Sequence, residues 1–243
     1  MIRKLNNVLL AVSAVVALAA FWHRNDLPAD LEFRKELAAE PRQTATDEPP
    51  FSVAYAGVSY AVEPKFAYDL YGLVVSYRLH DGTSTMHRRA NDHLNVADIC
   101  VAWSDTAFSP TLREIRFWNG IFTCNFETRD AEAWARFATN QVSNNHLLSA
   151  DERIRDRVAE VSIGDQIHVR GLLASYASPG GKRGTSTTRD DEGNGACETI
   201  FIESFAVLEP AHHGWRLALY CALAALAAGI AVHLGWPYRP YGP

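Results

Sequence analysis

The sequence predicts an α+β chain in which a mainly β domain with short helices lies between two terminal transmembrane helices. Three observations predict this. Uncharged apolar stretches occur near both ends of the 243 residues. Between them, short runs rich in β-branched and aromatic residues are separated by turn-forming residues, as strands are. All 28 acidic residues but only 18 of the 23 basic residues lie in this middle region, which therefore carries a net charge of −10.

The first apolar stretch, Leu5 to Trp22, follows two basic residues. Its uncharged part is short for a bilayer, which needs about 20 residues. Ala17-Leu18-Ala19 also matches the small-residue pattern at signal-peptide cleavage sites. Residues 1–24 are predicted to be an uncleaved anchor, with a cleaved signal peptide as the alternative.

The second apolar stretch, Leu217 to Leu234, has no formal charge and is flanked on both sides by tryptophan and arginine. Aromatic and basic residues gather in this way at membrane interfaces. Residues 211–243 are therefore predicted to hold a transmembrane helix and a short tail, and a buried core helix is the alternative.

Residues 25–50 carry a helical pattern from Leu27 to Glu40 followed by prolines, which predicts a juxtamembrane helix and linker. The domain then occupies residues 51–210. Phe51 to Val62 is predicted as an edge strand, and Lys65 to Leu79 as the first main strand.

The polar stretch His80 to Asn95 is predicted as a loop. It contains His80, His87 and His93. Their spacing fits no zinc template, so we interpret them as solvated histidines and predict no metal site.

The next elements follow from local patterns. Val96 to Trp103 predicts a buried strand that carries Cys100. Arg113 to Trp118 and Ile121 to Phe126 alternate on either side of Asn119-Gly120, which predicts a hairpin with a type I′ turn. Asp130 to Phe137 predicts a short helix.

Ser149 to Glu152 forms a capping box, which predicts a helix that runs to about Glu160. Ile163 to Gly171 and Cys197 to Ile202 predict the last two strands. The order of strand, strand, strand, helix, strand, strand is that of an OB-fold, a five-stranded barrel. An OB-like barrel is therefore the predicted architecture.

The cysteines indicate the compartment. Cys221 lies in the second apolar stretch, which leaves Cys100, Cys124 and Cys197 in the domain. In an oxidising space two of these three would pair. All three pairings stay open, with a weak preference for Cys100 with Cys124.

The loop Thr185 to Gly195 is the first candidate binding site, because its polar groups could bind a cation or a sugar. A solvated turn is the preferred interpretation of this loop. Two asparagines and a histidine before the capping box form the second candidate, since they either tie the helix entrance to this loop or line a pocket. The ligand-binding candidates are Arg189, Asp190, Asp191, Asn194, Asn144, Asn145 and His146.

A thiol site is the candidate for catalysis. Cysteine hydrolases need a thiolate beside an imidazole that a third polar group orients. Cys197 or Cys124 with His146 supplies these groups, with Asp190 or Asn144 as the orienting residue. The surrounding residues match no nucleophile signature, so structural cysteines are the preferred interpretation. No cofactor is predicted.

The domain also resembles a widespread group of bacterial membrane-associated proteins of unknown function. The resemblance covers about Lys65 to Leu208 and implies membrane association, but no chemistry. The shared sequence motifs are Tyr71-Gly72-Leu73-Val74-Val75-Ser76, Phe122-Thr123-Cys124, Asn144-Asn145-His146-Leu147, Ile163-Gly164-Asp165-Gln166, Thr185-Ser186-Thr187-Thr188-Arg189-Asp190 and Gly193-Asn194-Gly195-Ala196-Cys197-Glu198.

These patterns predict a binding or interaction module of the bacterial cell envelope. It would be anchored in the inner membrane by two spans, with the domain on the periplasmic side. An envelope protein or a small polar ligand is the expected partner. Nucleic acid is not, because a net charge of −10 cannot neutralise phosphates. A thiol-dependent hydrolase is the alternative function.

Overall fold

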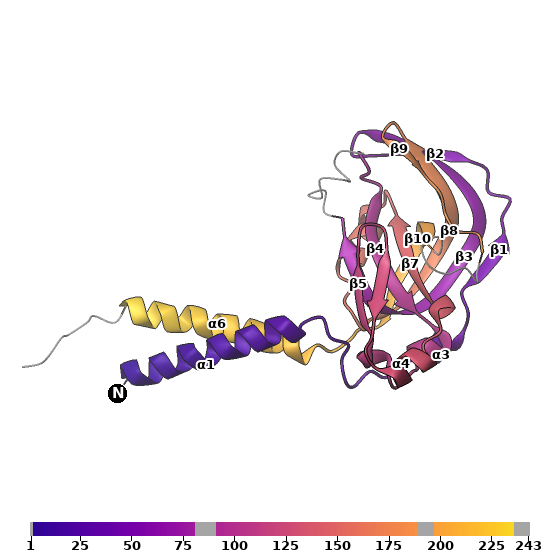
Figure 1. Ribbon diagram of the computed structural model, residues 1–243. Helices are drawn as coiled ribbons and strands as arrows, with labels where there is room; N and C mark the ends of the chain where they lie inside the picture. The colour runs from indigo at the N-terminus through magenta and orange to yellow at the C-terminus, as the bar shows by residue number, and fades with distance from the viewer. Residues whose placement is uncertain (1, 81–90, 189–196, 236–243) are drawn as a thin grey trace, which may run out of the picture. The chain divides into compact units, whose positions relative to one another are not determined.

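The computed structural model describes residues 2–80, 91–188 and 197–235 (Figure 1). The chain forms two compact units. One contains Met1–Asp30 and His212–Pro243, and the other contains Leu31–Ala211.

The first unit is a pair of helices, α1 (Ile2–His23) and α6 (Gly214–Gly235), which pack against each other. Both are long and apolar enough to cross a membrane, by length and composition. Few of their residues are buried, and large apolar side chains such as Leu18 and Leu234 are 72% and 79% exposed. A core helix of a soluble protein would instead be mostly buried, so this exposure argues against that alternative.

A polar contact joins the two helices. Asn6 donates a buried hydrogen bond of 3.0 Å to the carbonyl oxygen of Gly229. A Cβ atom on Gly229 would lie 2.7 Å from Leu10, so the glycine permits this close approach. Small residues and amide hydrogen bonds of this kind are typical of helix pairs in membranes.

The second unit is built on one mixed sheet, which has eight strands within the described residues. The strand order is β1-β3-β4-β7-β10-β8-β9, and β2 pairs with β3. The strands are β1 (Arg42–Ala45), β2 (Phe51–Tyr55), β3 (Val58–Leu79), β4 (Asn95–Ala102), β7 (Val142–Leu148), β8 (Gln166–Ser178), β9 (Gly181–Arg183) and β10 (Cys197–Glu209).

A five-strand ring organises this sheet. The long strand β3 pairs with β4 along one part and with β8 along another, so hydrogen bonds run from β3 through β4, β7, β10 and β8 back to β3. The β7–β10 pair is parallel and the others are antiparallel. The α+β class is therefore confirmed, but the ring is not a true barrel.

The third strand of the ring was not predicted. It is β7, which contains Asn144 and His146. The hairpin is present as a separate sheet of β5 (Arg116–Asn119) and β6 (Cys124–Glu127). Asn119 pairs with Cys124, so residues 120–123 form a four-residue loop instead of a two-residue turn.

The helices of this unit are short. The predicted α4 (Ala131–Arg136) and α5 (Glu152–Ala159) are present, and α3 (Ser104–Ala107) was not predicted. Asp151 caps α5 by accepting from the Arg153 amide, whereas Ser149, two residues earlier, accepts from the Asp151 amide. The remaining helical elements are 3-10 turns at Lys35–Ala38, Leu112–Glu114 and Thr139–Gln141.

The segment before the domain also differs from the prediction. The helix expected over Leu27 to Glu40 is reduced to the turn Lys35–Ala38, which buries Leu37. The following residues form β1, which pairs with Tyr68 and its neighbours on β3. This segment therefore belongs to the folded unit and is not only a linker.

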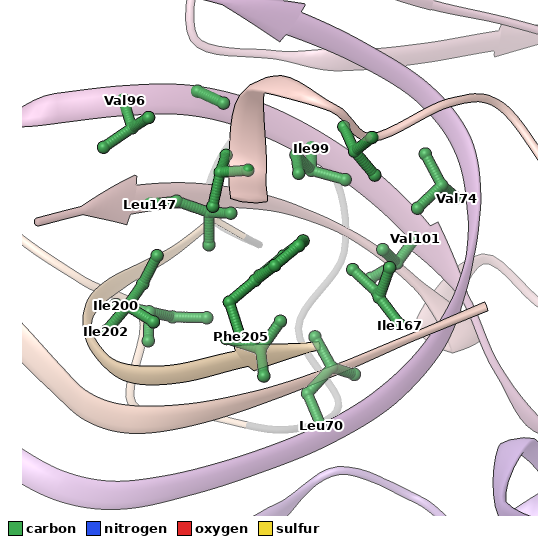
Figure 2. Close-up of a cluster of buried hydrophobic side chains, with 14 of the residues drawn as sticks. Leu70, Val74, Val96, Ile99, Val101, Leu147, Ile167, Ile200, Ile202 and Phe205 are labelled. Atoms are coloured by element: carbon green, nitrogen blue, oxygen red, sulfur yellow. The ribbon is translucent and has the colours of Figure 1, made fainter. Parts of the chain in front are cut away.

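The hydrophobic core fills the interior of the ring (Figure 2). Ile99 and Val101 of β4 point into it, as do Leu147 of β7 and Ile200 of β10. Successive side chains of a strand point to opposite faces. The residues that alternate with these apolar ones therefore lie on the outer face of β4, β7 and β10.

Candidate functional site

The outer face of the ring brings together residues from three strands. Cys197, the first residue of β10, is the parallel partner of Asn144 on β7. His146 lies two residues after Asn144 and therefore on the same face. Asp98 of β4 is the antiparallel partner of His146. The fold thus places a thiol, an imidazole and a carboxylate side by side.

A series of polar contacts runs from the Asp98 carboxylate to the Cys197 thiol. His146 Nδ1 lies 2.6 Å from Asp98 Oδ1. His146 Nε2 lies 3.5 Å from Asn144 Nδ2, which in turn is 4.0 Å from Cys197 Sγ. The Asn144 amide therefore contacts both the imidazole and the sulfur.

The carboxylate is deeply buried and has several polar neighbours. Asp98 is 1% exposed, and its Oδ1 also accepts a hydrogen bond of 3.1 Å from Asn95 Nδ2. His80 Nε2 lies 3.1 Å from the same oxygen. Burial favours the neutral acid, but the hydrogen bonds and positive charges of His146 and His80 outweigh it and hold the pKa of Asp98 well below its usual range.

The imidazole is held in its charged form. Burial would lower the pKa of His146, but hydrogen bonds and charge interactions with Asp98 and Cys197 raise it to about 9. At neutral pH the ring is therefore an imidazolium between a carboxylate and a sulfur. The interpretation of His80 as a solvated residue is wrong, because His80 is 9% exposed and contacts Asp98. His93 is half-buried, and His87 lies outside the described residues.

A disulfide joins two of the three cysteines of the domain. Cys100 and Cys124 are joined, with their Cα atoms 5.6 Å apart, so the preferred pairing is present. Cys124 is therefore not available as a nucleophile. Cys197 is a free, half-buried thiol, and Cys221 is a free thiol in α6. The disulfide indicates an oxidising environment, since such bonds are rare in the cytosol.

The hairpin covers the site. The disulfide ties β6 to β4, and Arg78 donates to the carbonyl oxygen of Gly120. The Phe122 ring packs edge-on against the His146 ring, with centroids 5.8 Å apart. The backbone carbonyl oxygen of Phe122 lies 3.6 Å from Cys197 Sγ. The guanidinium of Arg183 stacks 3.8 Å above the same ring. The imidazole is thereby shielded from solvent.

A pocket of about 320 Å³ opens beside the thiol. Its described lining consists of aromatic, hydroxyl, amide and sulfur-containing side chains and one valine. These residues are Trp118, Thr123, Cys124, Asn125, Phe126, Thr139, Val142, Ser143, Asn144 and Cys197. A cavity of this size accepts a small organic group.

The other sequence candidates fall into two groups. Asn145 is buried and points away from the thiol, because its amide donates to the Ile99 carbonyl and to Ser143 Oγ. Its role is structural. Arg189, Asp190, Asp191 and Asn194 lie outside the described residues, so their place relative to the site is not defined.

Sequence reasoning missed Asp98 as the residue that orients His146. One signal was present, because Asp98 is the lone charge in the apolar run Val96 to Trp103. A carboxylate inside a buried strand needs a partner, and a histidine is a suitable one. Among the described residues, no group of three or more His, Cys, Asp or Glu side chains could hold a metal ion.

No protein-family model matches the chain, and no curated protein matches it significantly.

Proposed function

We propose that this chain is a membrane-anchored enzyme that transfers or hydrolyses acyl groups through a thioester on Cys197. The observation that carries the proposal is that Asp98, His146 and Cys197 lie on one sheet face. His146 is hydrogen-bonded to Asp98, and the Asn144 amide contacts both His146 and Cys197. Cysteine hydrolases on unrelated folds use the same three roles of orienting group, acid–base and nucleophile.

The residues would act in two steps. Transfer of the Cys197 thiol proton to His146 gives a thiolate and an imidazolium. The thiolate attacks the carbonyl carbon of an amide, ester or thioester, and the carbonyl π electrons move onto oxygen. When the intermediate collapses, the bond to the leaving group breaks, and His146 gives its proton to that group. His146 then takes a proton from water or from an amine, which attacks the thioester and releases Cys197. Asp98 stabilises the imidazolium throughout.

Several observations support a place in the bacterial envelope. Two helices have the length and composition of membrane spans, and the disulfide suits an oxidising space. The order of the ring strands, with α5 between the third and the fourth, supports an OB-like domain. The resemblance to bacterial membrane-associated proteins agrees with this. We infer that the domain faces the periplasm and that both termini lie in the cytoplasm.

A binding module without catalysis is the second candidate. The pocket next to Cys197 favours it, because aromatic and amide side chains together suit a small polar ligand. In that case Cys197 would be a half-buried structural thiol beside the ligand.

Acylation of the thiol distinguishes the two functions. The full chain in detergent micelles, with Cys221→Ser as background so that Cys197 is the free thiol of interest, is incubated with an activated ester and its intact mass is measured. We expect a single acyl adduct. Cys197→Ala in the same background should form none, and His146→Gln should form it much more slowly. Absence of an adduct in the background protein would favour the binding module.

A further inference from the structure

A row of polar side chains crosses the ring beside the thiol. Ser76 on β3 is opposite Cys100 on β4, Cys100 is opposite Asn144 on β7, and Asn144 is opposite Cys197 on β10. Residues directly opposite each other in a sheet point to the same face. Asn119 of the hairpin lies above this row, paired with Cys124 and hence next to the disulfide.

A chain of hydrogen bonds fixes the orientation of the Asn144 amide. Ser76 Oγ donates to Asn119 Oδ1 at 2.7 Å, and Asn119 Nδ2 donates to Asn144 Oδ1 at 3.1 Å. Because its oxygen is engaged by Asn119, Asn144 directs its NH₂ group to the side of the thiol. Ser76 and Asn144 are 4% and 1% exposed, so this arrangement is held inside the protein.

The NH₂ group of Asn144 makes only long contacts on that side. It lies 3.5 Å from His146 Nε2 and 4.0 Å from Cys197 Sγ. Strong N–H···O bonds are about 2.7–3.2 Å long, so a closer acceptor would be favoured over both. When an acyl carbon bonds to Sγ, its oxygen stands one bond beyond that carbon and enters the region in front of this donor.

The pocket supplies the space for the rest of the acyl group, since Asn144 and Cys197 both line it. None of the described residues that line it carries a charge, and Trp118 and Phe126 offer ring faces. A charged group moved into such a site would lose its hydration without gaining a counter-charge, at a large cost. The lining therefore selects uncharged groups.

We propose that this pocket is the acyl-binding site for an uncharged acyl group, and that Asn144 is a catalytic residue that donates to the carbonyl oxygen as it becomes negative. Ser76 and Asn119 are positioning residues that hold the Asn144 amide. The inference rests on the proposed function, because it names the substrate class and the oxyanion donor of the same thiol.

Two reactions of Cys197 test the role of Asn144. Acylation by p-nitrophenyl phenylacetate passes through an oxyanion, whereas alkylation by iodoacetamide displaces iodide and forms none. In the Cys221→Ser background, Asn144→Ala should lower the acylation rate by about 10²–10³ and leave the alkylation rate nearly unchanged. Asn119→Ala, farther from the thiol, should lower acylation less and also spare alkylation. Its use keeps the test decisive if Asn144→Ala does not fold.

The acyl preference is tested with a matched ester that carries a carboxylate on the phenyl ring. The uncharged ester should acylate Cys197 much faster, and equal rates would overturn the assignment of the pocket.

Equal loss of acylation and alkylation in Asn144→Ala would make Asn144 a support for His146 and not an oxyanion donor. If neither ester acylates the background protein while iodoacetamide still alkylates Cys197, both the proposed function and this inference are wrong. If Asn144→Ala is acylated at the normal rate, only this inference is wrong.

Discussion

Replacement of Asp98 by asparagine should change the charge state of His146 more than any other single substitution of similar shape. Asparagine keeps the size of the side chain and an oxygen that can accept from His146 Nδ1, but it removes the negative charge. The hydrogen bond of 2.6 Å then joins the imidazole to a neutral amide. Burial, which disfavours the charged ring, is no longer opposed by a carboxylate.

The size of the effect follows from the two pKa values. In the native protein the pKa of His146 is raised from 6.5 to about 9. Without the carboxylate we expect it to fall to 6.5 or below. Since one pH unit corresponds to 1.36 kcal/mol, this interval is worth about 3 kcal/mol of preference for the charged ring. The side chain of His146 is only 11% exposed, so solvent reduces this value little.

The same pair should make stability depend on pH. A group whose pKa is raised on folding adds stability that is complete below its unfolded pKa and is lost as pH rises through its folded pKa. The native domain should therefore lose stability between pH 6.5 and about 9. Asp98→Asn should be less stable at pH 6 and should show a flatter profile over that range.

Two measurements check this prediction. The ring signals of His146 are followed by NMR as a function of pH and assigned by their loss in His146→Gln. Urea unfolding at pH 6 and pH 9 gives the free energy of unfolding for both proteins. If His146 in Asp98→Asn still titrates near 9, or if the stability of both proteins changes equally with pH, Asp98 does not hold the imidazolium and the reasoning fails.

Three further substitutions test the fold that supports the site. The double substitution Cys100→Ser and Cys124→Ser opens a loop of 24 residues and should lower the free energy of unfolding by about 3.5 kcal/mol. Urea unfolding of the oxidised protein and of the variant measures this difference, and an unchanged midpoint would contradict the prediction. Gly171→Ala would place a Cβ 2.1 Å from the Phe201 carbonyl oxygen, so thermal unfolding should show a loss of about 1–3 kcal/mol, and a native melting temperature would argue against this register. Gly229→Leu should weaken the α1–α6 pair, because even a Cβ atom at residue 229 would lie 2.7 Å from Leu10. Fewer engineered disulfide cross-links should then form between the two helices. Ala222→Leu provides a comparison at another buried position.

Much of the fold could be predicted because the signals are local. The apolar run around Ile99 identifies β4, and alternation on both sides of Asn119-Gly120 identifies the hairpin. The capping residues before α5 locate that helix to within two residues, since Asp151 and not Ser149 is the cap. Each of these patterns depends on neighbours in the sequence and not on distant contacts.

The site was harder to predict because it depends on pairing between distant strands. Strand β7 contains Ser143-Asn144-Asn145-His146, which lacks the alternation of a half-buried strand because both of its faces hold buried polar groups. Its parallel pairing with β10 has no local signature, yet that pairing places Cys197 beside Asn144. His146 and Cys197 could be selected by residue type. Asp98 stands out as a lone charge in a buried strand, but only the register of β4 and β7 identifies it as the partner of His146.

The distribution of the site over three strands determines when the thiol gains its neighbours. Asp98 and His146 are 48 residues apart in the chain, and Asn144 and Cys197 are 53 apart. Cys197 is the last of these residues to be synthesised, and it meets the others only when β10 inserts between β7 and β8. In a nascent polypeptide Cys197 therefore lacks these neighbours, and it gains them only when the ring of strands is complete.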